Sequence, residues 1–125
     1  MTNAEKQQEA LRRARAGAAQ AAVDEQNTPW GEPQTMVTIA AGIVHITTAS
    51  HGGCRLSPAR AAQVLDKFPT YQPWIEGGEW WEEDADMALV IATFPTEFRS
   101  HLLLETISRT TESARRIYNS QLERR

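Results

Sequence analysis

The chain has 125 residues, of which 41% are hydrophobic and 23% charged, with a formal net charge of −3 at pH 7. This length favours one domain with a modest core and leaves no room for a second, while the acidic balance argues against non-specific coating of nucleic acid. A single cysteine excludes an internal disulfide, and no apolar run approaches the roughly 20 residues that cross a bilayer. We therefore expect a cytoplasmic protein without a membrane partner.

Residues 4–25 contain no proline and are rich in alanine, glutamine, glutamate and arginine, which predicts one long helix. Its large apolar side chains are only Leu11 and Val23, so it can bury little more than a narrow alanine stripe. Residues 1–27 are thus predicted to form an N-terminal helical arm, which either stays solvated or pairs with another helix.

Residues 26–33 contain two prolines and a glycine, a composition that predicts a linker. Residues 34–49 follow with two β-branched runs separated by Ala40-Ala41-Gly42, which predicts a hairpin with glycine at its turn. Alternation places His45 on the same strand face as Ile43. On such an apolar face, histidine is more often a hydrogen-bonded core residue than a ligand.

The segment from His45 to Pro58 carries the densest polar chemistry of the chain. We expect residues 50–53 to form a glycine loop that leads from the strand into a helix, which Ser57 caps and Pro58 opens. Glycine-rich connections can bind anions through backbone NH groups, although this pattern is neither a phosphate loop nor the dinucleotide fingerprint. The candidate ligand-binding residues are His51, Gly52, Gly53 and Arg55.

Three side chains of this segment, His45, His51 and Cys54, have atom types that suit zinc. Their spacing matches no common zinc pattern, so we expect neither a metal nor another cofactor. Nucleophilic catalysis by Cys54 would need a neighbouring histidine to activate the thiol, and a buried, inert cysteine is the more common outcome. The sequence names no catalytic residue, and a binding protein is expected rather than an enzyme.

Residues 71–86 form a second unusual segment, with six acidic residues, three tryptophans and no basic residue. Aromatic side chains among charges suit a protein interface. The candidate partner-binding residues are Glu76, Glu79, Trp80, Trp81, Glu82, Glu83, Asp84 and Asp86. Two alternatives remain open: a solvated acidic turn at a helix N-terminus, and a carboxylate site that faces the histidine segment.

Residues 85–94 are nearly all apolar and predict a buried helix that ends before Pro95. Residues 95–98 are expected to form a turn, and residues 101–122 a final helix. The predicted fold is α+β: a small antiparallel sheet, made of the hairpin and a further strand near Ile75, packs on helices, with long helices at both ends. The predicted division is an arm at 1–27, an α+β core at 28–98 and a C-terminal helix at 99–125.

Three groups of residues carry a resemblance to a known family. They are Thr28-Pro29-Trp30-Gly31 with Gln34; Gly42-Ile43-Val44 and Thr47-Thr48-Ala49-Ser50-His51-Gly52-Gly53 with Leu56, Ser57 and Arg60; and Trp81-Glu82-Glu83-Asp84 with Ala88, Phe94, Pro95 and Phe98. Over residues 28–98 the chain resembles a domain-of-unknown-function family of phage, plasmid and other mobile-element proteins. The resemblance implies an origin in bacteria or their viruses and a close approach of His51 to residues 82–84, but no particular activity.

Two functional hypotheses from different classes follow. In the first, the chain is a phage or mobile-element accessory protein whose acidic, tryptophan-rich surface binds and inhibits a host defence machine, as an anti-CRISPR-like or other anti-defence factor. Its partner would be a host protein or nucleoprotein complex in the bacterial cytoplasm, without sequence-specific nucleic-acid binding of its own. In the second, His51, its glycine loop and Glu82-Glu83-Asp84 form a small-molecule or metal site, hydrolytic in one version. A third alternative is an assembly module that dimerises through its terminal helices.

Overall fold

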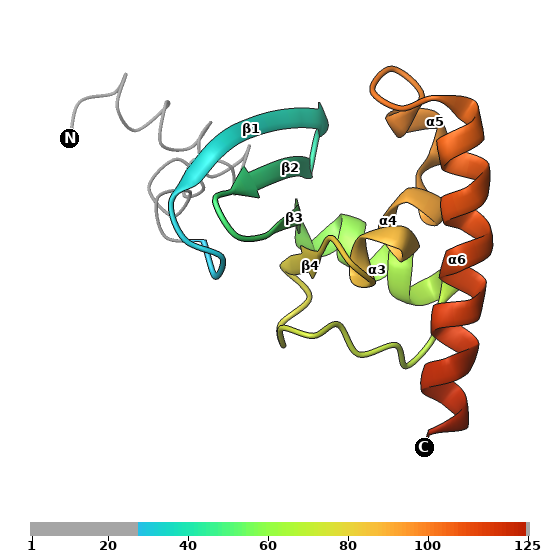
Figure 1. The fold of residues 1–125 in the computed structure, drawn as a ribbon. Helices are drawn as coiled ribbons and strands as arrows, with labels where there is room; N and C mark the ends of the chain where they lie inside the picture. The colour runs from blue at the N-terminus through green and yellow to red at the C-terminus, as the bar shows by residue number, and fades with distance from the viewer. Residues whose placement is uncertain (1–27, 125) are drawn as a thin grey trace.

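The computed structural model describes residues 28–124, so the predicted arm at 1–27 lies outside the described residues. Four strands, β1 (Pro33–Ala40), β2 (Ile43–Thr48), β3 (Gly52–Leu56) and β4 (Trp80–Glu82), form one antiparallel sheet in chain order (Figure 1). Within the described residues, four helices accompany the sheet: α3 (Pro58–Lys67), α4 (Asp86–Thr93), α5 (Pro95–Phe98) and α6 (Leu104–Glu123). The predicted α+β fold is confirmed. Within residues 28–124, no helix is both long and apolar enough to span a membrane.

The predicted hairpin joins β1 to β2 with Gly42 at its turn. The φ angle of Gly42 is +84°, a left-handed conformation that glycine adopts without strain. A Cβ atom at this position would lie 2.6 Å from the Ser57 hydroxyl, and the Gly42 carbonyl accepts a hydrogen bond of 2.9 Å from the Ser57 amide. The turn of the hairpin is therefore packed against the start of α3.

The glycine pair does not form the predicted loop. Gly52 and Gly53 begin β3, and the chain reverses instead at residues 49–51, where the Thr48 amide donates to the His51 carbonyl at 2.8 Å. Likewise, the last strand is Trp80–Glu82 rather than a segment near Ile75. Glycine weakens an isolated strand, but here it is the residue that allows backbones to approach closely on both sides of β3.

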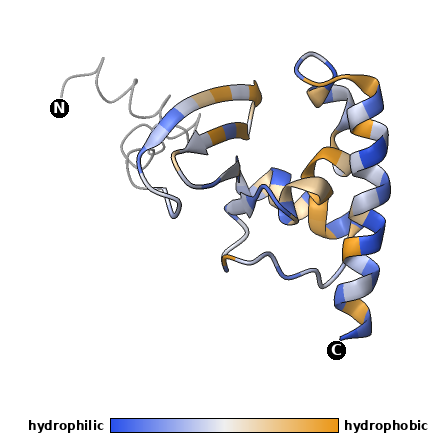
Figure 2. Cartoon of the chain, viewed as in Figure 1, coloured by the Kyte–Doolittle hydropathy of each residue, from blue (hydrophilic) through white to orange (hydrophobic). Residues whose placement is uncertain are grey.

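The core lies between one face of the sheet and the helices. Ile43, Cys54 and Trp81 from the sheet belong to the same buried cluster as Leu89 and Val90 of α4. The predicted buried helix is thus confirmed as α4, which is apolar over most of its surface (Figure 2). It lies between the sheet and α6 (Figure 1).

The final helix contributes to this core rather than standing apart from it. It begins at Leu104, slightly later than predicted, and buries Ile107 and Ala114 against α4 while its other face remains polar (Figure 2). The segment predicted as a turn at residues 95–98 is the short helix α5.

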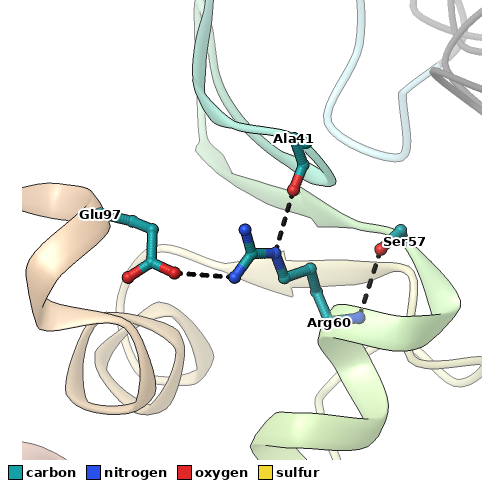
Figure 3. Close-up of polar contacts among 4 residues, drawn as sticks. All are labelled: Ala41, Ser57, Arg60 and Glu97. Atoms are coloured by element: carbon teal, nitrogen blue, oxygen red, sulfur yellow. Dashed lines mark hydrogen bonds and ion pairs between the residues drawn. The ribbon is translucent and has the colours of Figure 1, made fainter.

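A single arginine ties the hairpin to two helices, as Figure 3 shows. The Arg60 amide donates to the capping hydroxyl of Ser57 at 3.2 Å, which confirms the predicted helix start. Its guanidinium group donates to the Ala41 carbonyl at 3.0 Å and to the Glu97 carboxylate at 2.8 Å, and lies over the Phe94 ring. Charge-assisted contacts of this kind hold the hairpin turn, α3 and α5 in one arrangement.

Candidate functional site

His51 and the acidic turn after β4 meet at one end of the sheet. Because β3 pairs with β4, Gly53 lies opposite Glu82, and the Glu83 amide donates to the Gly52 carbonyl at 2.9 Å. This register places the β2–β3 turn, which carries His51, beside the chain that leaves β4. The close approach of His51 to residues 82–84, which the resemblance implied, is present in the structure.

Three side chains converge there. A ring nitrogen of His51 and one carboxylate oxygen each of Glu82 and Asp84 lie within 4.8 Å of one another. His51 and Asp84 are exposed, whereas Glu82 is buried, with 6% of its surface accessible. An imidazole and two carboxylates are ligands that divalent transition metals accept, and two carboxylates match the charge of such an ion.

Burial sets the electrostatics of Glu82. Desolvation raises the pKa of its carboxyl above the ordinary value of 4.5, and the neighbouring carboxylates of Asp84 and Asp86 raise the pKa further. A hydrogen bond of 3.0 Å from the Asp84 amide to the Glu82 carboxylate opposes this shift. Ionisation of this buried carboxylate therefore lowers the stability of the fold, and a bound cation would offset that loss.

The raised pKa predicts that the unfolding free energy depends on pH, and Glu82→Gln should remove this dependence. Since the pKa of Glu82 is raised on folding, the folded state binds more protons, and the unfolding free energy falls as pH rises from about 4.5 through the folded pKa. Urea unfolding from pH 4 to 7.5 should show Glu82→Gln gaining stability relative to wild type as pH increases. The titration of His45, whose pKa is lowered by burial, cancels because both proteins retain it.

Glu105→Gln is the matched control, since Glu105 is exposed in the first turn of α6. Glu105→Gln should not gain stability relative to wild type as pH increases, because the helix dipole favours a carboxylate in the first turn. Absence of a gain for Glu82→Gln would contradict a buried, desolvated carboxylate at this position.

The other candidates for ligand binding do not join His51. Gly53 pairs with Ile46 on one side and with Glu82 on the other, so the glycines are part of a paired strand rather than an open loop that could bind an anion. Arg55 forms an ion pair with Glu79, to which its Nε donates at 2.6 Å, and its guanidinium group lies 5.0 Å from the centre of the Trp80 ring. Of the four residues predicted for ligand binding, His51 belongs to the cluster with Glu82 and Asp84, whereas Gly52, Gly53 and Arg55 lie outside it.

The three side chains considered for zinc, His45, His51 and Cys54, do not come together either. Cys54 is fully buried, and burial raises the pKa of its thiol to about 12, which keeps the sulfur protonated. His45 lies opposite Cys54 in the β2–β3 register and is half-buried. Burial lowers the pKa of the His45 imidazole, the Glu83 carboxylate raises it, and His101 lowers it. Among residues 28–124, the side chains that converge with His51 are Glu82 and Asp84, not His45 and Cys54.

The acidic segment is partly internal. Trp81 is fully buried, stacks on Tyr71 and donates from Nε1 to the Gly78 carbonyl at 2.7 Å. Glu82 and Asp86 are also buried. Of the eight residues predicted for partner binding, these three lie inside the fold: Trp81 and Glu82 in β4, and Asp86 at the start of α4. Glu76, Glu83 and Asp84 are exposed, while Glu79 and Trp80 are half-buried beside Arg55.

Asp86 organises this segment from within. One carboxylate oxygen accepts from the Tyr71 hydroxyl at 2.5 Å, and the other accepts from the amides of Trp74 at 2.9 Å and Glu82 at 3.4 Å. Burial and the hydrogen bond to Asp86 both raise the pKa of Tyr71, so its hydroxyl stays a donor. Because a single oxygen accepts from both amides, the chain at Trp74 lies beside the end of β4.

Trp74 is an exposed residue outside the set predicted for partner binding. It is 80% exposed, although its backbone is fixed by Asp86. The signal available in the sequence was its position in Gln72-Pro73-Trp74, outside any expected helix and next to a proline. A tryptophan in such a segment has no regular element to pack it against the core.

Comparison with known proteins identifies one relationship. A family model described as a domain of unknown function (DUF7007) matches residues 23–124. The match continues through α6, beyond the region at 28–98 that carries the resemblance, and so includes the helix that packs on α4. No curated protein and no solved structure matches the chain.

Proposed function

The chain belongs to this family of domains of unknown function (DUF7007), and we propose that it acts by binding a protein partner through an acidic tryptophan surface. The surface consists of Trp74, Glu76, Glu83 and Asp84. The observation that carries the proposal is the 80% exposure of Trp74 on a backbone that a buried carboxylate holds in place.

Such a tryptophan is suited to anchor an interface. Burial of an indole ring against a partner is worth roughly 3 kcal/mol in removed apolar surface. Because the Trp74 amide is fixed by Asp86, little backbone freedom is lost on binding. Exposed carboxylates at Glu76, Glu83 and Asp84 would add attraction to a basic partner and increase the association rate.

The partner class that suits this surface is a host defence complex with a basic nucleic-acid groove. The chain has a net charge of −3, and an acidic protein that occupies such a groove competes with nucleic acid. The resemblance to phage, plasmid and mobile-element proteins supports the same role, that of an accessory protein that blocks host defence in an anti-CRISPR-like manner.

The test is inhibition of purified CRISPR effector complexes and other nucleoprotein defence complexes by the full chain. Wild type should form a complex and reduce loading of target nucleic acid, and Trp74→Ala should weaken binding about 30-fold, as expected for an interface hot spot. Leu103→Ala is the matched control, because Leu103 is also exposed, at 73%, but lies at the start of α6. Absence of complex formation, or equal loss in both variants, would count against the proposal.

A second candidate function is favoured by the convergence of His51, Glu82 and Asp84 within 4.8 Å. We propose that these side chains bind a divalent transition metal such as Zn²⁺ or Mn²⁺. Three protein ligands leave a coordination position for water, the arrangement on which hydrolytic metal sites depend.

Titration with Zn²⁺, Mn²⁺ and Mg²⁺ tests this candidate, with calorimetry to measure binding and urea unfolding to measure stability. Binding should raise the unfolding free energy by about 2.7 kcal/mol at a metal concentration 100 times the dissociation constant. His51→Ala and Asp84→Asn should lose most of this stabilisation, whereas His101→Ala, which removes another exposed histidine, should retain it. Equal titration curves for His51→Ala and wild type would eliminate the site.

A further inference from the structure

An open cleft of about 350 Å³ is lined by residues of β2, the turn after β4, α4 and α6. Its volume falls within the range of about 300–1,000 Å³ that is typical of small-molecule sites. The residues that line it come from segments far apart in the sequence, from His45 to Ile117. The cleft shares Glu83 and Asp84 with the acidic tryptophan surface and Asp84 with the metal candidate, but its other lining residues belong to neither.

One side of the cleft is apolar, although polar groups make up the larger part of its accessible lining. Met87, Ala88 and Ile91 present one face of α4, and Ile117 of α6 completes it. Met87 and Ile117 are only partly buried, so apolar surface remains accessible to a ligand. Thr110 and Ser113 of α6 add two hydroxyl groups to the lining.

The rim of the cleft is acidic. Glu83 and Asp84 are exposed and carry two carboxylates. In the part of the chain that the structure describes, no lysine or arginine lines the cleft. His45 is the remaining ionisable group of the lining, and burial lowers the pKa of its imidazole, which favours the neutral form, while the Glu83 carboxylate opposes this shift. A neutral imidazole can accept a hydrogen bond from a cation without repelling it.

We infer that this cleft binds a small amphipathic organic cation, with its apolar body on Met87, Ile91 and Ile117 and its ammonium group at Glu83 and Asp84. Charge complementarity selects this occupant. An anionic ligand would meet two carboxylates, and a fully polar cation would leave the apolar wall wet.

Three probes with the same apolar body and different head groups measure how charge affects binding to the cleft. Phenethylamine, 2-phenylethanol and 3-phenylpropionate carry positive, neutral and negative heads on the same phenyl group. The amine should bind with a dissociation constant on the order of 1 mM, a reasonable affinity for so small a ligand. It should bind about fivefold or more tightly than the alcohol, since exposed ion pairs contribute modestly, and the carboxylate should bind most weakly.

Methyl resonances of Met87 and Ile117, followed by NMR during titration of the full chain, locate the binding site. They should shift with the amine, while the indole resonances of Trp74 should not. Equal binding of the three probes, tightest binding of the carboxylate, or shifts confined to Trp74 would overturn the inference.

A variant separates the cleft from the acidic tryptophan surface, with which it shares Glu83 and Asp84. Ser113→Leu should fill the cleft and reduce amine affinity at least tenfold, without changing complex formation through Trp74. Ser120→Leu is the matched control, because Ser120 is exposed on α6 and does not line the cleft. Unchanged amine binding in a folded Ser113→Leu protein would also overturn the inference.

Discussion

Gly53→Ala should destabilise the domain by about 3 kcal/mol or more, since overpacking at this site has no room to relax. An added Cβ atom would lie 2.2 Å from the Trp81 carbonyl oxygen and 2.7 Å from the Trp30 ring. The first of these contacts is with the backbone of β4, so the strand itself would have to move. Urea unfolding monitored by circular dichroism measures the loss, and lost β3–β4 pairing should also expose the Trp81 indole.

Gly77→Ala provides the comparison for Gly53→Ala. Its φ angle of +106° strains an alanine, but a Cβ atom there would meet nothing within 4 Å. Strain alone should cost about 1–2 kcal/mol. If the two variants lost equal stability, close backbone approach would not be the reason for glycine at position 53. Because β3–β4 pairing also brings Glu82 to His51, Gly53→Ala should lose the response to added metal as well.

Local signals in the sequence were sufficient for much of the fold. Ser57-Pro58 marked the start of α3, Gly42 marked the hairpin turn, and the apolar run at 85–94 indicated a buried helix. Each of these features depends on residues within a few positions of one another. The physical cause is thus visible in a short stretch of sequence.

Tertiary contacts explain the features that were not predicted. The Gly52-Gly53 pair favours a loop by its intrinsic preference, and only the approach of the Ile46 and Trp81 carbonyls shows why a strand needs glycine there. The acidic segment looked like a surface because charges usually are exposed. Burial of Asp86 depends on two amides and a hydroxyl that lie up to 15 residues away.

Only part of the candidate site could be predicted from the sequence, for the same reason. The meeting of His51 with the acidic turn followed from the family resemblance, whereas spacing along the chain gives no indication of it. The register of β3 against β4 is its structural cause. The cleft joins His45 to Ser113, and a single sequence contains no signal for that contact.

Asp86→Ala is expected to destabilise the domain by about 3–5 kcal/mol, the usual loss when a buried charged partner is removed. Three donors, the Tyr71 hydroxyl and the amides of Trp74 and Glu82, would lose their acceptor inside the fold. Asp66→Ala is the control, since Asp66 is exposed on α3 and its removal should change stability by less than about 0.5 kcal/mol.

A double-mutant cycle with Tyr71→Phe separates the hydroxyl contact from the two amide contacts. Tyr71→Phe alone should cost about 1–3 kcal/mol, and much less in the Asp86→Ala background, because the hydroxyl then has no carboxylate to bind. Hydrogen exchange at the Trp74 amide should accelerate in Asp86→Ala but not in Tyr71→Phe, because only the former removes its acceptor. Additive energies would contradict the contact between the Tyr71 hydroxyl and Asp86, and unchanged exchange at Trp74 would show that Asp86 does not hold this tryptophan. The rigid presentation of Trp74 on which partner binding depends would then have no structural cause.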